Sequence, residues 1–116
     1  MKNYVQPGDT IVATAPAAVS SGAGILIGAL FGIATQDAAN GADLPIKTLG
    51  VFTLPKAASQ AWTAGDKVYW DDANDECTTV ASGNYPIGIA TADVAGGAAD
   101  MIGTVRLDGI ATAAAA

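Results

Sequence analysis

A chain of 116 residues is long enough for one domain with its own hydrophobic core, so neither a metal ion nor a disulfide is required to hold it folded. The formal net charge of −6, from five basic and eleven acidic residues, disfavours direct contact with nucleic acid, which basic patches bind. The chain has no histidine, which excludes serine–histidine and cysteine–histidine catalysis within it.

The composition is typical of a light, turn-rich β protein. Hydrophobic residues make up 51% of the chain, but many of them are alanine, and 14 residues are glycine. Only 14% of residues are charged, which indicates either that a partner covers part of the surface or that a monomer carries a bland surface. The single cysteine suits assembly in a reducing cytoplasm, and the N-terminus lacks the apolar core of a signal peptide. The longest apolar run, residues 23–34, is shorter than the roughly 20 residues of a membrane helix, so no membrane contact is expected.

The N-terminal residues 1–8 predict an arm rather than part of the core. They are mostly polar, they contain Tyr4 and Val5 as candidate anchors, and they end at a Pro–Gly break. A first strand is predicted over residues 9–14, closed by Pro16.

The apolar run at residues 24–34 fits a helix or a strand by hydrophobicity alone. Gly28 and Gly32 would each cost about 1 kcal/mol inside a helix, so the sequence favours two short strands or one bent strand. In a strand, Ile25, Ile27, Phe31 and Ile33 are expected on one face, because side chains alternate with a period of two.

Short strands are also predicted over residues 45–49 and 50–54, after a loop at 37–43 that contains an Asn–Gly turn signal. Residues 57–62 favour either one helical turn or a loop.

Residues 66–81 predict a β-hairpin with an exposed acidic tip. Val68 and Trp70 fall on one face of its first strand, and Lys67 and Tyr69 on the other. Residues 73–76 offer no side chain to bury, and the β-branched residues at 78–80 suit a returning strand.

Two further strands are predicted over residues 85–90 and 101–107. The total of eight or nine short strands, separated by Gly, Pro and Asx turns, indicates an all-β fold, either a small barrel or a sandwich. The expected organisation is an N-terminal arm at 1–8, one β domain at 9–110 and a flexible alanine-rich tail at 111–116.

Candidate chemical sites are few. The pattern Asp72-x-Asn74-x-Glu76 matches the first ligand positions of a calcium loop, but Cys77 stands where that loop needs glycine, so a solvated acidic tip is the better interpretation. Acidic neighbours would raise the pKa of the Cys77 thiol, which disfavours a nucleophile. No catalytic residue, metal site or cofactor site is predicted.

The aromatic residues around the hairpin are better explained by packing than by ligand binding. Trp70 is expected in the core. Tyr69, on the opposite strand face, fits the core and a subunit interface equally well, and Trp62 is a second candidate for such an interface.

Several segments, taken in order, resemble the small capsid cement, or head decoration, proteins of tailed bacteriophages and prophages. The similarity extends over nearly the whole chain, except the alanine-rich end, which carries no motif. The segments that carry it are residues 3–9 (NYVQPGD), 14–16 (TAP), 21–22 before an apolar strand, 50–56 (GVFTLPK), 65–72 (GDKVYWDD) and 105–109 (VRLDG).

This resemblance implies a structural, non-enzymatic virion protein made in the bacterial cytoplasm. Proteins of this kind sit on the outside of the phage head, commonly as homotrimers, and bridge neighbouring major capsid subunits to reinforce the expanded shell. We expect the arm residues Asn3, Tyr4, Val5 and Gln6 to bind the capsid by adding as a strand to an edge of the lattice.

The alternative function is a phage-borne module that binds a host-surface ligand. Such a module needs a groove with clustered aromatic residues, and the sequence offers few. A small hydrolase that uses paired aspartates is disfavoured, because a chain of this size provides no deep cleft for a carboxyl of raised pKa.

Overall fold

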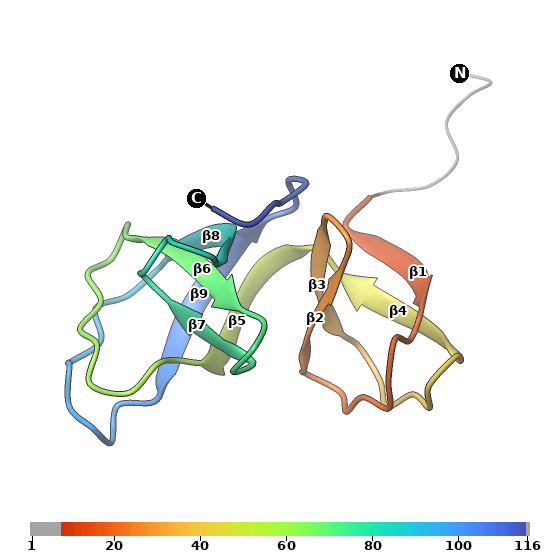
Figure 1. Ribbon diagram of the computed structural model, residues 1–116, viewed down its shortest axis with the longest axis horizontal. Helices are drawn as coiled ribbons and strands as arrows, with labels where there is room; N and C mark the ends of the chain where they lie inside the picture. The colour runs from red at the N-terminus through yellow and green to blue at the C-terminus, as the bar shows by residue number, and fades with distance from the viewer. Residues whose placement is uncertain (1–7, 116) are drawn as a thin grey trace.

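The computed structural model describes residues 8–115 and contains strands, turns and loops but no helix within them, which confirms the predicted all-β class. Two antiparallel sheets lie side by side, and the larger one curls into a half-barrel (Figure 1). The four-stranded sheet has the order β1-β4-β3-β2 and contains β1 (Thr10–Thr14), β2 (Gly24–Ile27), β3 (Leu30–Ala34) and β4 (Asp43–Lys47). The five-stranded sheet has the order β5-β9-β8-β6-β7 and contains β5 (Leu49–Pro55), β6 (Lys67–Asp71), β7 (Glu76–Thr78), β8 (Tyr85–Ala90) and β9 (Ile102–Asp108).

The apolar run at 24–34 forms a tight hairpin, so the prediction of two short strands is confirmed. Gly28 adopts a φ of 60° at the first position of the two-residue turn, where glycine carries little steric cost. The expectation that Ile25 and Phe31 share a face is wrong. Ile25 pairs with Gly32, and Phe31 pairs with Leu26, so odd-numbered residues of β2 lie on the same face as even-numbered residues of β3.

Both faces of β3 pack against other parts of the protein, and all of its residues except the first are buried. One side, with Phe31 and Ile33, joins the main core of the five-stranded sheet, where the Phe31 ring lies 5.0 Å from the Trp70 ring between centroids. The other side belongs to a smaller core beneath the loops at 15–23 and 35–42, formed by Ala15, Ile25, Ala34, Leu44 and Ile46.

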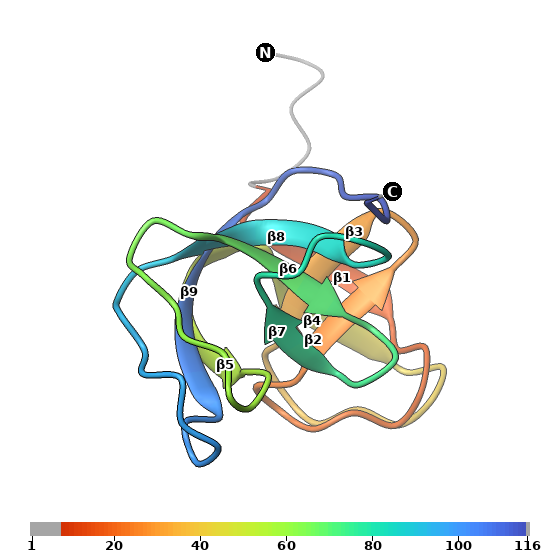
Figure 2. The same ribbon diagram turned by 60° about the vertical axis from the view of Figure 1, so that its left-hand side comes forward.

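Residues 56–62 form a loop without a helical turn, anchored by a buried polar network. The Lys56 ammonium group is buried and donates hydrogen bonds to the carbonyls of Ala57 and Gln60. The Gln60 side-chain oxygen accepts hydrogen bonds from the Trp62 indole at 2.8 Å and from the Thr79 backbone at 2.9 Å. Lys56 also forms a parallel bridge with Cys77, which draws β7 toward the end of β5 and curls the five-stranded sheet (Figure 2).

The acidic hairpin is confirmed, with a shift in its second strand. β6 pairs with β7, but β7 begins at Glu76 and ends at Thr78, and Val80 lies outside it with 55% of its surface exposed. The reason is the left-handed conformation of Asp75, with φ of 52°, which completes the turn in the four residues 72–75.

The C-terminal residues 111–115, where a flexible tail is expected, contact both sheets. The Thr112 backbone N–H donates to the Ala29 carbonyl in the β2–β3 turn, and its hydroxyl donates to the Pro86 carbonyl in β8, at 2.8 and 2.7 Å. Ala115 exchanges further backbone hydrogen bonds with Gly83 and Asn84. This segment therefore connects the two sheets a second time, beside the single residue Thr48 that joins β4 to β5.

Candidate functional site

The acidic tip of the β6–β7 hairpin is held in place by its own side chains. Asp71 accepts backbone hydrogen bonds from Ala73 and Asn74 and a side-chain hydrogen bond from Asn74 at 2.8 Å. These contacts are those of an Asx turn, which positions the next carboxylates, Asp72 and Asp75, in solvent.

Trp70 connects this tip to the core. Its side chain is only 2% exposed, as the sequence predicts, and its indole N–H donates to Asp72 Oδ1 at 3.1 Å. Asp72 is thereby fixed at the edge of the buried ring.

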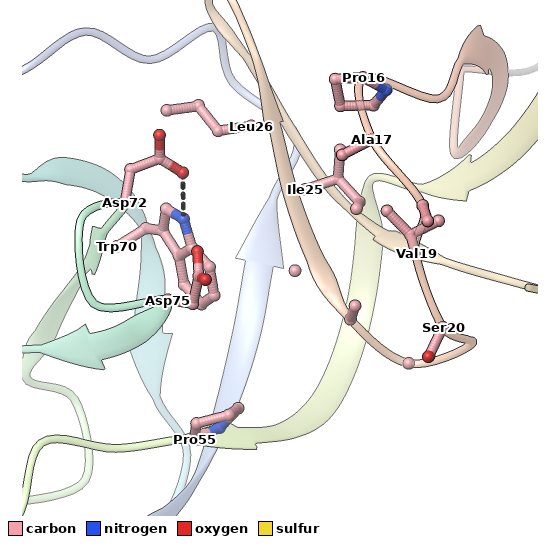
Figure 3. A pocket seen from close by; sticks show the side chains of 14 residues that line it. Pro16, Ala17, Val19, Ser20, Ile25, Leu26, Pro55, Trp70, Asp72 and Asp75 are labelled. Carbon is pink, nitrogen blue, oxygen red and sulfur yellow. Dashed lines mark hydrogen bonds between the residues drawn. The ribbon is translucent and has the colours of Figure 1, made fainter. Parts of the chain in front are cut away.

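A groove of about 610 Å³ lies between the hairpin tip and the edge strand β2 (Figure 3). One wall consists of the exposed loop at 16–20, which contributes Pro16, Ala17 and Val19. The other wall contains Pro55, Trp70, Asp72 and Asp75, and β2 lies between the two walls. The groove thus combines an apolar side, an acidic side and a strand edge.

The groove offers no catalytic constellation. Within residues 8–115 no three side chains of the kind that ligate metals converge, so the calcium-like spacing at 72–76 does not produce a cluster. Burial, reinforced by the nearby Glu76 carboxylate, raises the pKa of the Cys77 thiol to about 12, and the thiol therefore stays protonated and inert. The part of the chain that the structure describes also contains no helix of the length and hydropathy that a membrane crossing requires.

The predicted interface residues differ in their surroundings. Trp62 is 2% exposed and packs against Gly103, so its side chain offers almost no surface to another subunit. Tyr69 is half-buried on the outer face of the five-stranded sheet, opposite Pro86 and Thr78. The proposed capsid-binding residues Asn3, Tyr4, Val5 and Gln6 lie outside the described residues.

The outer face around Tyr69 carries a surface that the sequence reasoning missed. A row of four exposed side chains crosses four neighbouring strands, and we call it the outer-face row: Val51 on β5, Arg106 on β9, Ile89 on β8 and Lys67 on β6. Val51 and Ile89 are 57% and 40% exposed.

Two members of this row, Lys67 and Ile89, line a small hollow of about 190 Å³ together with Ile110. The signal available in the sequence was the presence of apolar residues on both faces of one predicted strand, with Val51 on one face and Phe52 and Leu54 on the other. An antiparallel sheet that faces water on one side usually alternates apolar with polar residues, and the exposed Val51 departs from that alternation.

A family model described as phage cement protein matches residues 5–108, which include all nine strands of the described chain. No curated protein and no solved structure gives a significant match.

Proposed function

Since the chain belongs to the phage cement protein family, and is thus a phage structural protein associated with the capsid, we propose that it decorates the outside of the head. There it joins neighbouring major capsid subunits and stabilises the expanded shell against the packaged DNA. The observation that carries this proposal is the family match over residues 5–108.

The arm is the proposed attachment to the capsid. Residues Asn3 to Gln6 add as a strand to an exposed edge of a capsid subunit, so main-chain hydrogen bonds provide the binding free energy. Attachment through several copies at once turns modest individual contacts into strong retention.

The self-association that we propose is a homotrimer formed through the outer face of the five-stranded sheet. Exposed apolar side chains in the outer-face row, together with the half-buried Tyr69, support this choice. Burying Val51 and Ile89 against a neighbouring copy would stabilise the assembly by roughly 25 cal/mol for each Å² of apolar surface removed from water.

Deletion of residues 1–6 tests the attachment. The shortened protein is expected to keep its fold and oligomeric state, but to lose binding to expanded heads in a sedimentation assay. The matched control is the full-length chain with Val12→Asp, a surface change on β1 that leaves the arm intact. Wild-type occupancy by the shortened protein would disprove the arm model.

The proposed location on the phage head is tested by fractionating virions and counting the copies of this protein per particle by mass spectrometry. A decoration protein is expected in hundreds of copies per particle, roughly in proportion to the capsid subunits. Copy numbers typical of a tail or fibre component would favour the alternative, a module for a host-surface ligand, and absence from purified particles would exclude both virion roles.

A further inference from the structure

Strand β2 is an edge of the four-stranded sheet, and its outward backbone groups face the groove. The Ala34 N–H donates to the Ala23 carbonyl at 2.9 Å, and the two-residue turn at 28–29 makes Ile27 and Leu30 a hydrogen-bonded pair. Because such pairs alternate along an antiparallel ladder, the N–H and C=O groups of Gly24 and Leu26 point away from β3. Within the described chain no other strand pairs with this edge. An unpaired edge of this kind is a template for strand addition.

The two walls of the groove suit the alternating side chains of an added strand. Successive side chains of a strand next to β2 would point in turn toward the loop at 16–20 and toward the hairpin tip. The loop wall, with Pro16, Ala17 and Val19, accommodates small apolar groups. The opposite wall, formed by the tip of the β6–β7 hairpin, presents the carboxylate of Asp72, which accepts the Trp70 hydrogen bond, and that of Asp75.

Charge identifies the residues that the hairpin wall would accept. Among residues 8–115 the one ion pair joins Lys47 to Asp9, at 3.7 Å, and lies elsewhere on the four-stranded sheet. Asp72 and Asp75 therefore have no cationic partner within the described part of the chain, and a lysine or arginine of another molecule complements them.

We propose that the groove binds an extended segment of another protein, which pairs with β2 as a fifth strand and alternates basic with small apolar side chains. The inference goes beyond the proposed capsid decoration and does not depend on it, because the groove recognises backbone edges and charge irrespective of where the protein is located.

The test uses the isotopically labelled protein and a blocked peptide of alternating lysine and valine, long enough to span the four residues of β2. The amide signals of Gly24 and Leu26 are expected to shift on titration and to exchange more slowly with solvent, since the outward N–H groups become hydrogen-bonded. A peptide of alternating glutamate and valine is expected to leave them unchanged.

Charge-removing variants test the acidic wall without disturbing the turn. Asp72→Asn keeps an oxygen to accept the Trp70 hydrogen bond, and Asp75→Asn suits the left-handed backbone, which asparagine tolerates well. The double variant is expected to weaken binding of the lysine peptide by roughly threefold to tenfold at low salt. The control is Asp93→Asn with Asp100→Asn, which makes the same change of charge away from the groove and is expected to leave affinity unchanged.

Three results would overturn the proposal: no shift at Gly24 and Leu26, equal binding of the glutamate peptide, or equal loss of affinity in the two double variants. A fourth would identify a different occupant. If deletion of residues 1–7 changes the Gly24 and Leu26 signals without added peptide, the groove holds the chain's own N-terminal segment. None of these experiments uses a phage head, so the outcome of the peptide titrations is independent of the outcome of the capsid-binding assay.

Discussion

At the scale of single residues, Cys77 shows how tertiary burial decides the chemistry of a side chain. Its thiol is fully buried, directly opposite Trp70 in the β6–β7 pair, and its pKa is raised to about 12, first by burial and then by Glu76. The sequence predicts the direction of this shift from the acidic neighbours, but the larger cause, burial, depends on the closing of the hairpin onto the core.

The raised pKa predicts a loss of stability at alkaline pH. The unfolded thiol ionises near the ordinary value of 9.0, whereas the folded thiol stays protonated up to about 12. Between these values the unfolded state binds fewer protons, so the free energy of unfolding falls as the pH rises, by up to about 1.4 kcal/mol per unit. Urea titrations across this window should show wild type losing roughly 3 kcal/mol more than Cys77→Ala, which lacks the group. Parallel losses in the two proteins would assign the effect to other groups.

At the scale of elements, the β2–β3 hairpin is the piece that joins the two cores. Gly24 allows β2 to lie directly against aromatic rings, because a Cβ atom there would stand 2.8 Å from Trp70 and 3.0 Å from Phe31. Strand β2 of this hairpin lies between the two walls of the groove, so the packing of the β2–β3 hairpin positions the free edge of β2.

Gly24→Ala is therefore expected to destabilise the protein by about 1–3 kcal/mol, the usual cost of forcing an extra methyl group into a packed core. Gly8→Ala is the matched control, since a Cβ atom at Gly8 meets no atom within 4 Å. Both variants are compared by urea unfolding with tryptophan fluorescence as the probe. Equal stability of the two would show that Trp70 can move away without cost.

At the scale of the whole molecule, the two sheets are connected at Thr48 and again by the C-terminal segment. Thr112 is 6% exposed and bonds to the β2–β3 turn on one side and to β8 on the other. Among the described residues, the four side chains of the outer-face row are exposed.

Thr112→Val keeps the shape of the side chain but removes the hydroxyl that bonds to Pro86, and is expected to cost about 1–2 kcal/mol. Removal of residues 111–116 should cost more, because the bonds to Ala29, Gly83 and Asn84 are lost as well. The surface variant Thr14→Val, at the exposed end of β1, serves as the control in chemical denaturation. An unchanged midpoint for the shortened chain would support a tail that contributes nothing to folding.

The proposed assembly is tested by two valines of nearly equal exposure, Val51 at 57% on the outer face and Val12 at 59% on β1. Val51→Asp places a charge in the proposed interface and is expected to convert the trimer to monomers in light scattering, because an unpaired buried charge is costly. Val12→Asp should leave the trimer intact. Dissociation by the β1 variant instead would move the interface to the four-stranded sheet.

Local patterns in the sequence were sufficient for the all-β class, the positions of most strands, the acidic hairpin and the burial of Trp70. Period-two alternation and turn residues are local patterns, so they can be interpreted without knowledge of the rest of the fold. The family assignment rests on the same local segments, and the match over residues 5–108 bears it out.

Only the tertiary structure decided which faces meet and where surfaces form. The two-residue turn at Gly28 reversed the expected alignment of Ile25 with Phe31, and Trp62 became buried against Gly103, far away in the chain. The groove joins residues 16–26 to residues 55–75, and the outer-face row joins four strands. Such contacts depend on the register and closure of distant strands, which no local spacing specifies.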